Sequence, residues 1–507
     1  MKAAMQDPKG ESNILEFSDA EIVIGLVFPV GTDYSGVQLT LENYLKRFRY
    51  KPATISLSEY IKKVVARLSL PDVALQEDTE FNRVNSYMDA GNKLRELSKS
   101  SDFVVAAAVS GLSQQRAKEG ERKLPNPRAA TIFRSLKRPE EVALLRKIYG
   151  LGFFLIGIFA SEEERKKYLT RDKNLTNQEA DTLMARDADE AGDFGQRTRD
   201  TFQLADVFVR LSGEEYKNQL ERFLDLVFGN PYHTPEPDEH AMFLAYSASL
   251  RSAQLARQVG AAIRSPHGDI LAIGCNDVPQ AGGGLYWPGP HDKRDHTLKV
   301  DSNDQQLRLI TTDILTRLKI PDVELINPSE VFKGSLLLDV SEFGRAVHAE
   351  MDALSTCARI GTSVRAAELF TTTFPCHTCT RHIIASGISR VVYIEPYPKS
   401  LAAKLHKDAV DVSAKGRRLK KFNKFGRIPF EPFVGIGPRR FFDLFSMRLS
   451  RGYEIKRKSN GKVVEWVRSS ASPRIQMLAL SYLEREQIAA VRIFSATDEL
   501  KKQGRLL

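Results

Sequence analysis

Two short motifs in the second half of the chain combine zinc-binding residue types with a carboxylate. The sequence contains His348-Ala-Glu350 and, further along, Pro375-Cys-His-Thr-Cys379. Each motif is predicted to open a helix, where the helix dipole favours a thiolate, and two cysteines three residues apart lie on one face of the first turn. One histidine and two cysteines supply three zinc ligands and leave the fourth tetrahedral position for water. The pattern predicts a catalytic Zn2+ site with His348, Cys376 and Cys379 as ligands.

Glu350 adds a group that can move protons at this predicted site. Zinc lowers the pKa of a bound water from about 16 to about 7, and the Glu350 carboxylate is two residues from His348. We therefore expect Glu350 to be the catalytic residue of a hydrolysis that releases ammonia. The alternative is a structural zinc site, which normally needs a fourth protein ligand. The other candidate ligands are interpreted as core residues or as surplus to these three: Cys275, Cys357, His377 and His382.

The elements that must position these residues alternate between strands and helices. In the second half, the pattern predicts helices at 347–360 and 376–386 and strands at 368–372 and 390–394. In the first half, apolar runs predict strands at 21–28, 130–136, 153–160 and 205–211, with helices between them. Strands separated by helices imply a parallel, doubly wound sheet. Turn-forming residues at 229–237 mark a boundary between two domains.

A loop with two glycines follows the first predicted strand. Residues 25–33 read Gly-Leu-Val-Phe-Pro-Val-Gly-Thr-Asp, and they stand between a strand and a helix, where a phosphate-binding loop belongs. Five residues separate Gly25 from Gly31, and Thr32 stands where a Walker A loop has its lysine. Gly25, Gly31 and Thr32 are therefore candidate nucleotide-binding residues. The alternative is a simple turn between strand and helix.

The spacing H-x-E … P-C-x-x-C is the signature of zinc nucleobase deaminases, and the second half of the chain resembles cytidine and deoxycytidylate deaminases. Two further segments carry the resemblance: Arg257-Gln-Val-Gly-Ala261 and Gly274-Cys-Asn-Asp-Val-Pro279. The resemblance implies that Asn276 hydrogen-bonds the nucleotide sugar, with a turn-forming role as the alternative. Arg257 is a candidate for holding the phosphates. The insertion at 280–345 departs from the minimal deaminase, and it either covers the substrate or binds a second metal ion.

The first half resembles P-loop nucleoside-phosphate kinases, at Arg138-Pro-Glu-Glu-Val-Ala-Leu-Leu-Arg146 and Arg186-Asp-Ala-Asp-Glu190. Because the loop lacks its lysine, a degraded kinase fold that serves binding, regulation or assembly is expected. The predicted fold class is α/β, with an N-terminal doubly wound P-loop kinase-like domain and a C-terminal cytidine-deaminase-like α/β/α domain. The predicted boundaries are a flexible N-terminus at 1–20, the kinase-like domain at 21–230, the deaminase domain at 236–450, and a basic hairpin and helix extension at 451–507.

This pair of domains resembles the bacterial anti-phage dCTP deaminases. The resemblance implies zinc-dependent deamination of dCTP, and also of dCMP, to deoxyuridine nucleotides, which deprives replicating phage DNA of dCTP. It also implies a homo-oligomer that an inhibitory small RNA or a nucleotide regulator restrains. Two alternatives use the same chemistry: a polynucleotide deaminase that edits cytosine in DNA or RNA, and a housekeeping dCMP deaminase for dTMP synthesis. A non-enzymatic sensor that binds RNA or nucleotides is a further alternative.

Composition narrows the class of protein. The 507 residues are 42% hydrophobic and contain four cysteines, which fits a globular chain and excludes a disulfide scaffold. No apolar run reaches the length of about 18 residues that a membrane span needs, and the N-terminus lacks an apolar signal core, so we expect a cytoplasmic protein with no membrane partner. The net charge is +10, and the positive charge is densest at 415–427. This segment is expected to bind a polyanion, which is nucleic acid, a nucleoside phosphate or acidic lipid. The alternative is a solvated face or a self-association surface.

Overall fold

The chain folds into two compact units. The first comprises Met1–Pro235 together with Val434–Leu507, and the second comprises Glu236–Phe433. The computed structural model describes residues 19–502 with the exception of 69–72, 117, 120–121, 322, 324–325, 341, 413–425 and 450. The predicted flexible N-terminus at 1–20 therefore falls almost entirely outside the described residues, as does the basic segment at 415–427.

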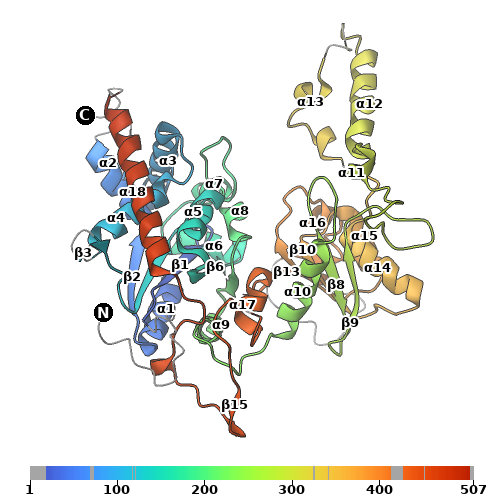
Figure 1. Cartoon of the computed structure of the whole chain (residues 1–507). Helices are drawn as coiled ribbons and strands as arrows, with labels where there is room; N and C mark the ends of the chain where they lie inside the picture. The colour runs from blue at the N-terminus through green and yellow to red at the C-terminus, as the bar shows by residue number, and fades with distance from the viewer. Residues whose placement is uncertain are drawn as a thin grey trace. The chain divides into compact units, whose positions relative to one another are not determined.

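A six-stranded sheet forms the centre of the first unit (Figure 1). Its order is β14-β7-β6-β1-β5-β2, and neighbouring strands are parallel except that β14 runs antiparallel to β7. The chain adds strands on one side of β1 and then on the other, so the strand order reverses at β1. The strands are β1 Ile22–Val27, β2 Lys51–Ser56, β5 Ala129–Arg134, β6 Phe153–Phe159, β7 Val207–Arg210 and β14 Gly435–Ile436. The four strands predicted in the first half are confirmed as β1, β5, β6 and β7.

Helices and buried apolar strands make the core of this unit. All six residues of β1 and the first six of β6 are buried, which explains why both segments are continuous apolar runs. Local signals start the helices: Ser161 caps α6 by accepting a hydrogen bond from the Glu164 N–H at 3.3 Å, and Pro139 opens α5. The helices are α1 Ser35–Arg47, α2 Leu57–Leu68, α3 Glu80–Ser98, α4 Phe103–Gln115, α5 Pro139–Tyr149, α6 Glu162–Arg171, α7 Asn177–Ala188, α8 Thr198–Phe202, α9 Glu215–Val227, α17 Phe441–Phe445 and α18 Ala479–Lys502.

The C-terminal segment completes the first unit. In β14, Gly435 pairs with Phe208 of β7, and the long helix α18 packs against α4 and α5. The buried Arg116 guanidinium joins the two ends of this unit, because it contacts Glu21 at 2.5 Å and Glu486 of α18 at 2.6 Å. Residues 434–450, which the sequence analysis assigns to the deaminase domain, therefore pack with the first unit. The structure differs from the predicted boundary because a strand pairing between such distant residues leaves no local signal.

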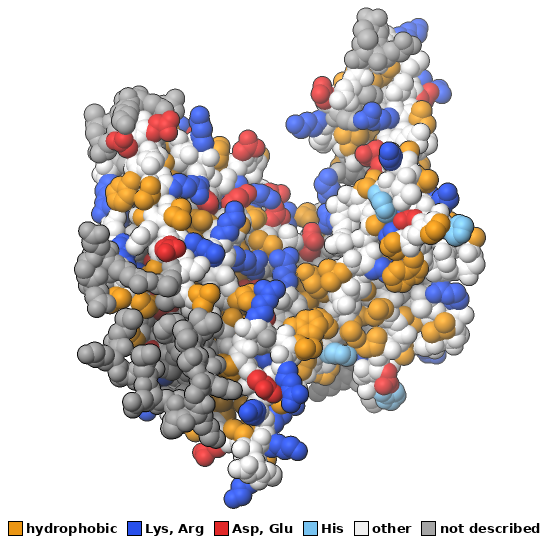
Figure 2. All heavy atoms as spheres, viewed as in Figure 1, with side chains coloured by type: hydrophobic (Ala, Val, Ile, Leu, Met, Phe, Trp, Pro, Cys, Tyr) orange, Lys and Arg blue, Asp and Glu red, His pale blue; other side chains and the backbone are white. Residues whose placement is uncertain are grey.

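Two short hairpins accompany this sheet. One consists of β3 Lys118–Glu119 and β4 Arg122–Lys123. The other, β15 Lys458–Ser459 with β16 Lys462–Val463, is the basic hairpin that the sequence predicts. It turns at Asn460 and Gly461, both with positive φ. Figure 1 places β15 at the lower end of the view, and Figure 2 shows Lys and Arg side chains there.

The second unit is built on a mixed sheet of order β12-β13-β11-β10-β8-β9. β8 runs antiparallel to β9 and β10, whereas β10, β11, β13 and β12 run parallel to one another. The strands are β8 Gly260–Arg264, β9 Ile270–Cys275, β10 Glu368–Thr373, β11 Arg390–Glu395, β12 Val410–Asp411 and β13 Ile428–Pro432. The helices outside the insertion are α10 Pro237–Ser249, α14 Ala349–Ile360, α15 His377–Ala385 and α16 Ala402–Leu405. The predicted helices at 347–360 and 376–386 are confirmed as α14 and α15.

Helices α10 and α14 cover opposite faces of this sheet. A Cβ on Gly260 would meet the Ala245 carbonyl of α10, and a Cβ on Gly274 would meet the Ala349 carbonyl of α14 at 2.4 Å. Because Gly274 pairs with Ala261, next to Gly260, the two glycines point to opposite faces. The glycines therefore allow both helices to lie directly on the sheet, which gives an α/β/α arrangement.

Among its described residues, the insertion at 280–345 contains the α-helices α11 Asp295–Leu298, α12 Ser302–Arg317 and α13 Pro328–Val331 and a 3-10 helix at Leu336–Asp339. They are drawn in yellow in Figure 1, beyond the sheet of the second unit. Across the described part of the chain, no helix has both the length and the apolar character needed to span a membrane.

Candidate active site

Three of the predicted site residues meet where two helices begin. His348 is the N-cap of α14, and Cys376 is the N-cap of α15, where its sulfur accepts a hydrogen bond from the Cys379 N–H at 3.4 Å. The His348 Nδ1 atom lies 3.3 Å from the sulfur of Cys376 and 3.3 Å from that of Cys379. The three donor atoms lie within 4.8 Å of one another and could hold a metal ion.

The donor set fits zinc. Bonds of about 2.3 Å to sulfur and about 2.0 Å to nitrogen in a tetrahedral site keep these donors roughly 3.5 Å apart, close to the distances observed. The hydrogen bond with Cys376 raises the pKa of His348 to about 9. Hydrogen bonds with Cys379 and then His348 lower the pKa of Cys376 to about 3. This low pKa favours the thiolate of Cys376, the form that binds a metal.

Glu350 lies beside these donors and is almost completely buried, with 4% of its surface exposed. One turn of α14 carries both His348 and Glu350, and the Glu350 carboxylate accepts a hydrogen bond from the Cys379 thiol at 3.5 Å. Burial raises the pKa of Glu350, while the charge of His348 opposes that rise. The pKa of the Glu350 carboxyl is therefore higher than that of an exposed glutamate, which suits a group that accepts a proton and returns it.

All of these residues except Cys379 line one cavity of about 290 Å³ within the second unit, together with Asn276 and Arg257. The structure therefore brings together the predicted metal, catalytic and substrate residues. Sequence reasoning missed two classes of lining residue. The aromatic side chains of Phe374 and Tyr397 line the cavity, and the position of Phe374 directly before Pro375 is a signal that could have identified it. The insertion contributes others, for which the sequence offers no local signal: Asp295, Asp301, Asn303, Asp304 and Gly344.

Asn276 holds the wall of this cavity in place. Its side-chain oxygen accepts a hydrogen bond from the Val259 N–H at 2.7 Å, and its amide nitrogen donates to the Arg257 carbonyl at 2.8 Å. The side chain thereby fixes the segment that carries Arg257. The Arg257 guanidinium is itself half exposed and lies 3.0 Å from the Glu395 carboxylate, so a phosphate would have to compete with Glu395 for it.

Residues 235–395 match the family model described as the cytidine and deoxycytidylate deaminase zinc-binding region. Most of the second unit is therefore similar to the zinc-binding region of cytidine and deoxycytidylate deaminases. The match includes His348, Glu350 and both cysteines of the metal cluster. The zinc-binding character of the family agrees with the donor set found in the structure.

Similar proteins are also found beyond the family model. ComE operon protein 2 of Bacillus subtilis (strain 168) is 38% identical over 65 residues, which are 13% of this chain and 34% of that protein. A probable deoxycytidylate deaminase of Drosophila melanogaster is 28% identical over 218 residues, 42% of this chain and 86% of the relative. The crystal structure of the dCMP deaminase from cyanophage S-TIM5 with dCMP and dUMP is 20% identical, covers 40% of this chain and 100% of its own, and has a TM-score of 0.22. The chain spans about a third of the length of ComE operon protein 2.

The loop predicted to bind phosphate in the first unit is built differently from the deaminase site. Gly25 lies inside β1, paired with Phe133 and Leu155, so it is not a loop residue and that assignment is corrected. A Cβ at Gly25 would meet Leu136 at 2.6 Å, which explains the glycine by packing. Gly31 does turn the chain, with φ of +84°, and Thr32 is buried without a hydrogen bond from its hydroxyl to any described residue.

A carboxylate of the protein itself occupies this loop. The Val30 N–H donates to Asp187 at 2.8 Å, and the Lys137 ammonium contacts the other oxygen of Asp187 at 2.7 Å. Lys137 also donates to the Phe28 carbonyl at 2.9 Å. A backbone N–H and a lysine are the groups with which a phosphate loop holds its ligand. In this protein, the Val30 N–H and the Lys137 ammonium bind the Asp187 carboxylate instead of a ligand.

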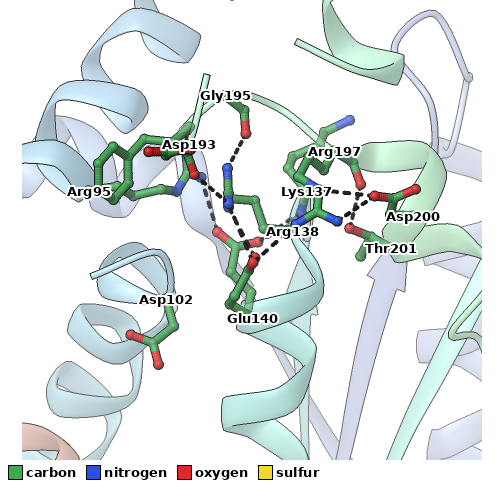
Figure 3. A network of polar contacts seen from close by, with 12 residues as sticks. Arg95, Asp102, Lys137, Arg138, Glu140, Asp193, Gly195, Arg197, Asp200 and Thr201 are labelled. Carbon is green, nitrogen blue, oxygen red and sulfur yellow. Dashed lines mark hydrogen bonds and ion pairs between the residues drawn. The ribbon is translucent and has the colours of Figure 1, made fainter. Parts of the chain in front are cut away.

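The arginines that support the kinase resemblance are also engaged within the protein. Figure 3 shows Arg138 beside Glu140 and the loop at 193–195: its guanidinium donates to the Asp193 carbonyl at 2.8 Å, to the Gly195 carbonyl and to Glu140 at 3.1 Å. Arg186 contacts Asp89 at 2.6 Å and Glu190 at 2.7 Å. These contacts fix loops of the first unit, and they give each arginine a structural role.

Proposed function

We propose that the second unit catalyses zinc-dependent hydrolytic deamination of deoxycytidine nucleotides, dCTP and also dCMP, to the deoxyuridine nucleotides and ammonia. The observation that carries this proposal is the convergence of the His348, Cys376 and Cys379 donors within 4.8 Å, beside a cavity that His348 and Cys376 line together with the buried Glu350. These four residues fall in the segment that matches the deaminase family. The similarity to a probable deoxycytidylate deaminase of Drosophila melanogaster supports a deoxycytidine nucleotide as substrate.

In this mechanism, His348, Cys376 and Cys379 would hold a zinc ion, and the ion would supply a water of lowered pKa. Glu350 accepts the proton of that water as oxygen adds to C4 of cytosine. The same carboxyl delivers this proton to N3, then takes the second proton from the hydroxyl now on C4 and gives it to the departing amine, so that ammonia leaves and C4 becomes a carbonyl. Its burial and raised pKa suit both steps, because the group must accept a proton and release it again near neutral pH.

The rest of the cavity orients the nucleotide. Phe374 and Tyr397 offer apolar faces to a base, and Asn276 fixes the wall next to Arg257. We assign the sugar contact to Asn276 and a phosphate contact to Arg257. A volume of about 290 Å³, with walls supplied by the insertion, suits a free nucleotide better than a base that remains attached to a long strand.

The biological role that we propose is depletion of dCTP in anti-phage defence. It is supported by the resemblance of the whole domain pair to anti-phage dCTP deaminases. Within this proposal, the first unit is a degenerate P-loop kinase-like domain that serves binding, regulation or assembly, which agrees with the reversal of strand order at β1. We also propose that the protein is a homo-oligomer and that a small RNA or a nucleotide regulator restrains it.

A polynucleotide-editing deaminase is the second candidate, favoured by the exposed basic residues of the β15–β16 hairpin, Lys456, Arg457, Lys458 and Lys462. One assay separates the alternatives: ammonia release from dCTP, dCMP, CMP, single-stranded DNA and RNA, each with the wild-type chain and with Glu350→Gln. We expect turnover of dCTP and dCMP that Glu350→Gln abolishes. Turnover of dCMP without dCTP would favour the housekeeping enzyme. Turnover of oligonucleotides without mononucleotides would contradict the proposal.

A further inference from the structure

The first unit contains a second, larger cavity, of about 550 Å³. It lies between the 3-10 turn Gly150–Gly152, which leads into β6, and the C-terminal segments 451–453 and 474–485. The cavity therefore lies at the amino end of β6. The Gly31 loop follows the carboxyl end of the parallel strand β1, so the cavity is distinct from the predicted phosphate loop. Its volume is in the range of sites for small organic ligands.

The charge of this cavity is one-sided. Arg451, Arg474 and Arg485 contribute to its wall, and among the described residues that line it none is Asp or Glu. Arg451 is exposed at the rim, whereas Arg485 is held by a hydrogen bond from its guanidinium to the Lys147 carbonyl at 2.7 Å. Three guanidinium groups around a wall without carboxylates attract an anion, and guanidinium geometry matches phosphate oxygens.

Arg474 is the most unusual of the three. Only 1% of it is exposed, its Nη1 donates to the Leu444 carbonyl at 3.0 Å, and its Nε and Nη2 have no hydrogen-bond partner among the described residues. Burial lowers the pKa of Arg474, and the nearby Tyr453 and Asp443 offset only part of this loss of hydration. A buried donor without an acceptor costs free energy that a ligand could recover.

The backbone holds Arg474 at this position before any ligand arrives. Its N–H donates to the Val227 carbonyl at 2.8 Å, and Gly452 packs so closely that a Cβ there would lie 2.2 Å from the Arg474 carbonyl oxygen. Aromatic residues complete the wall. The hydroxyls of Tyr149 and Tyr482 are bound to Glu486 at 2.9 Å and to Glu21 at 3.0 Å, so these side chains are fixed as well.

We propose that this cavity is a binding site for a small organic polyphosphate, with the phosphates on the arginines and an aromatic or sugar part against the tyrosines. The site is independent of the deaminase chemistry, since all of its residues belong to the first unit.

Isothermal titration of the full-length chain tests this proposal with three probes. Inorganic tripolyphosphate and ATP are expected to bind, and adenosine is not. Neither charged probe carries a cytosine, which avoids the substrate preference proposed for the catalytic cavity. Tripolyphosphate binding without any gain for ATP would identify an anion site alone and reject the organic part of the proposal. If neither tripolyphosphate nor ATP binds at millimolar concentration, the whole proposal is overturned.

Charge reversal then locates the site. Arg451→Glu, at the exposed rim, is expected to weaken the binding of both probes by about tenfold or more. The matched control is Arg448→Glu, because Arg448 is close in sequence, highly exposed and absent from the cavity wall. Equal affinity of wild type and Arg451→Glu would place the ligand elsewhere and contradict the proposal.

The unfolding temperature tests the role of the buried Arg474. Saturating tripolyphosphate is expected to raise the unfolding midpoint of the wild type and of Arg448→Glu. The increase should shrink in Arg451→Glu and vanish in Arg474→Gln, provided that this variant still unfolds cooperatively. If Arg474→Gln does not fold, Arg451→Glu alone decides, and an undiminished increase in that variant would contradict the proposal.

Discussion

The β1 loop of the first unit and the metal cluster of the second unit use their polar groups in opposite ways. In the loop, Asp187 takes up both the Val30 N–H and the Lys137 ammonium, so the protein satisfies its own donors. In the cluster, three donor atoms converge on one point, and the nearby Glu350 faces a cavity. A binding site therefore needs polar groups that the protein does not already bind with its own side chains. Glycine spacing alone does not identify such a site.

The largest effect is expected when the proton-transferring group of the second unit is removed. Glu350→Gln preserves shape but cannot accept a proton, so turnover of dCTP or dCMP should fall by about a thousandfold. Zinc content should stay at the wild-type level, because the ligands remain. Product formation and metal analysis of the same sample measure both. Glu342→Gln, which changes an exposed carboxylate near His377, is the control and should keep its activity. Wild-type rates for Glu350→Gln would remove this residue from the mechanism.

The next effect concerns a buried ion network that the first unit satisfies internally. Arg116→Met leaves the Glu21 and Glu486 carboxylates buried without their cation, which should lower the free energy of unfolding by about 3–5 kcal/mol. Urea unfolding can be followed by the fluorescence of Trp466 in a Trp287→Phe background, because the chain has only these two tryptophans. Arg47→Met breaks an exposed pair with Glu221 and should cost less than about 1 kcal/mol. Equal stabilities for the two variants would contradict this account.

A smaller loss is expected when the carboxylate in the β1 loop is neutralised. Asp187→Asn weakens the contacts with Lys137 and with the Val30 N–H and should cost about 1–3 kcal/mol in the same Trp466 assay. Asp181→Asn, which affects an exposed pair with Lys166, is the matched control and should be nearly neutral. A neutral outcome for Asp187→Asn would mean that the loop is not held by its own carboxylate, and the contrast with the second unit would disappear.

The smallest of these effects is expected at the cavity wall. Asn276→Ala frees the segment that carries Arg257 and Val259, and kcat/KM should fall by about tenfold with zinc retained. Asn276→Asp keeps the acceptor for the Val259 N–H but loses the donor to the Arg257 carbonyl, so its activity should lie between alanine and wild type. Identical activity of all three would show that the amide does not position this wall.

Sequence reasoning succeeded where the determining signals are local. Helix starts at Pro139 and Ser161 depend on residues within one turn, and the metal cluster depends on two such starts. It failed where distant segments decide. Asp187 reaches the β1 loop from 157 positions along the chain, and β14 joins a strand more than 200 residues before it. The insertion likewise contributes Asn303 to the catalytic cavity, and no sequence motif around Asn303 predicts that position.

Gly25 shows a further limit of pattern reasoning. A glycine next to an apolar run can begin a phosphate loop or relieve a close approach inside a strand, and the spacing to Gly31 does not distinguish these cases. The structure decides for packing, because Leu136 and Phe153 occupy the space that a side chain would need.

The zinc content of the full-length chain, purified without added metal, tests the central claim most directly. The account predicts one zinc per chain in the wild type and in Cys357→Ala, whose buried sulfur lies outside the cluster, and almost none in Cys376→Ala. A folded Cys376→Ala chain that still carries a full complement of zinc, or an active wild type that carries none, would contradict it.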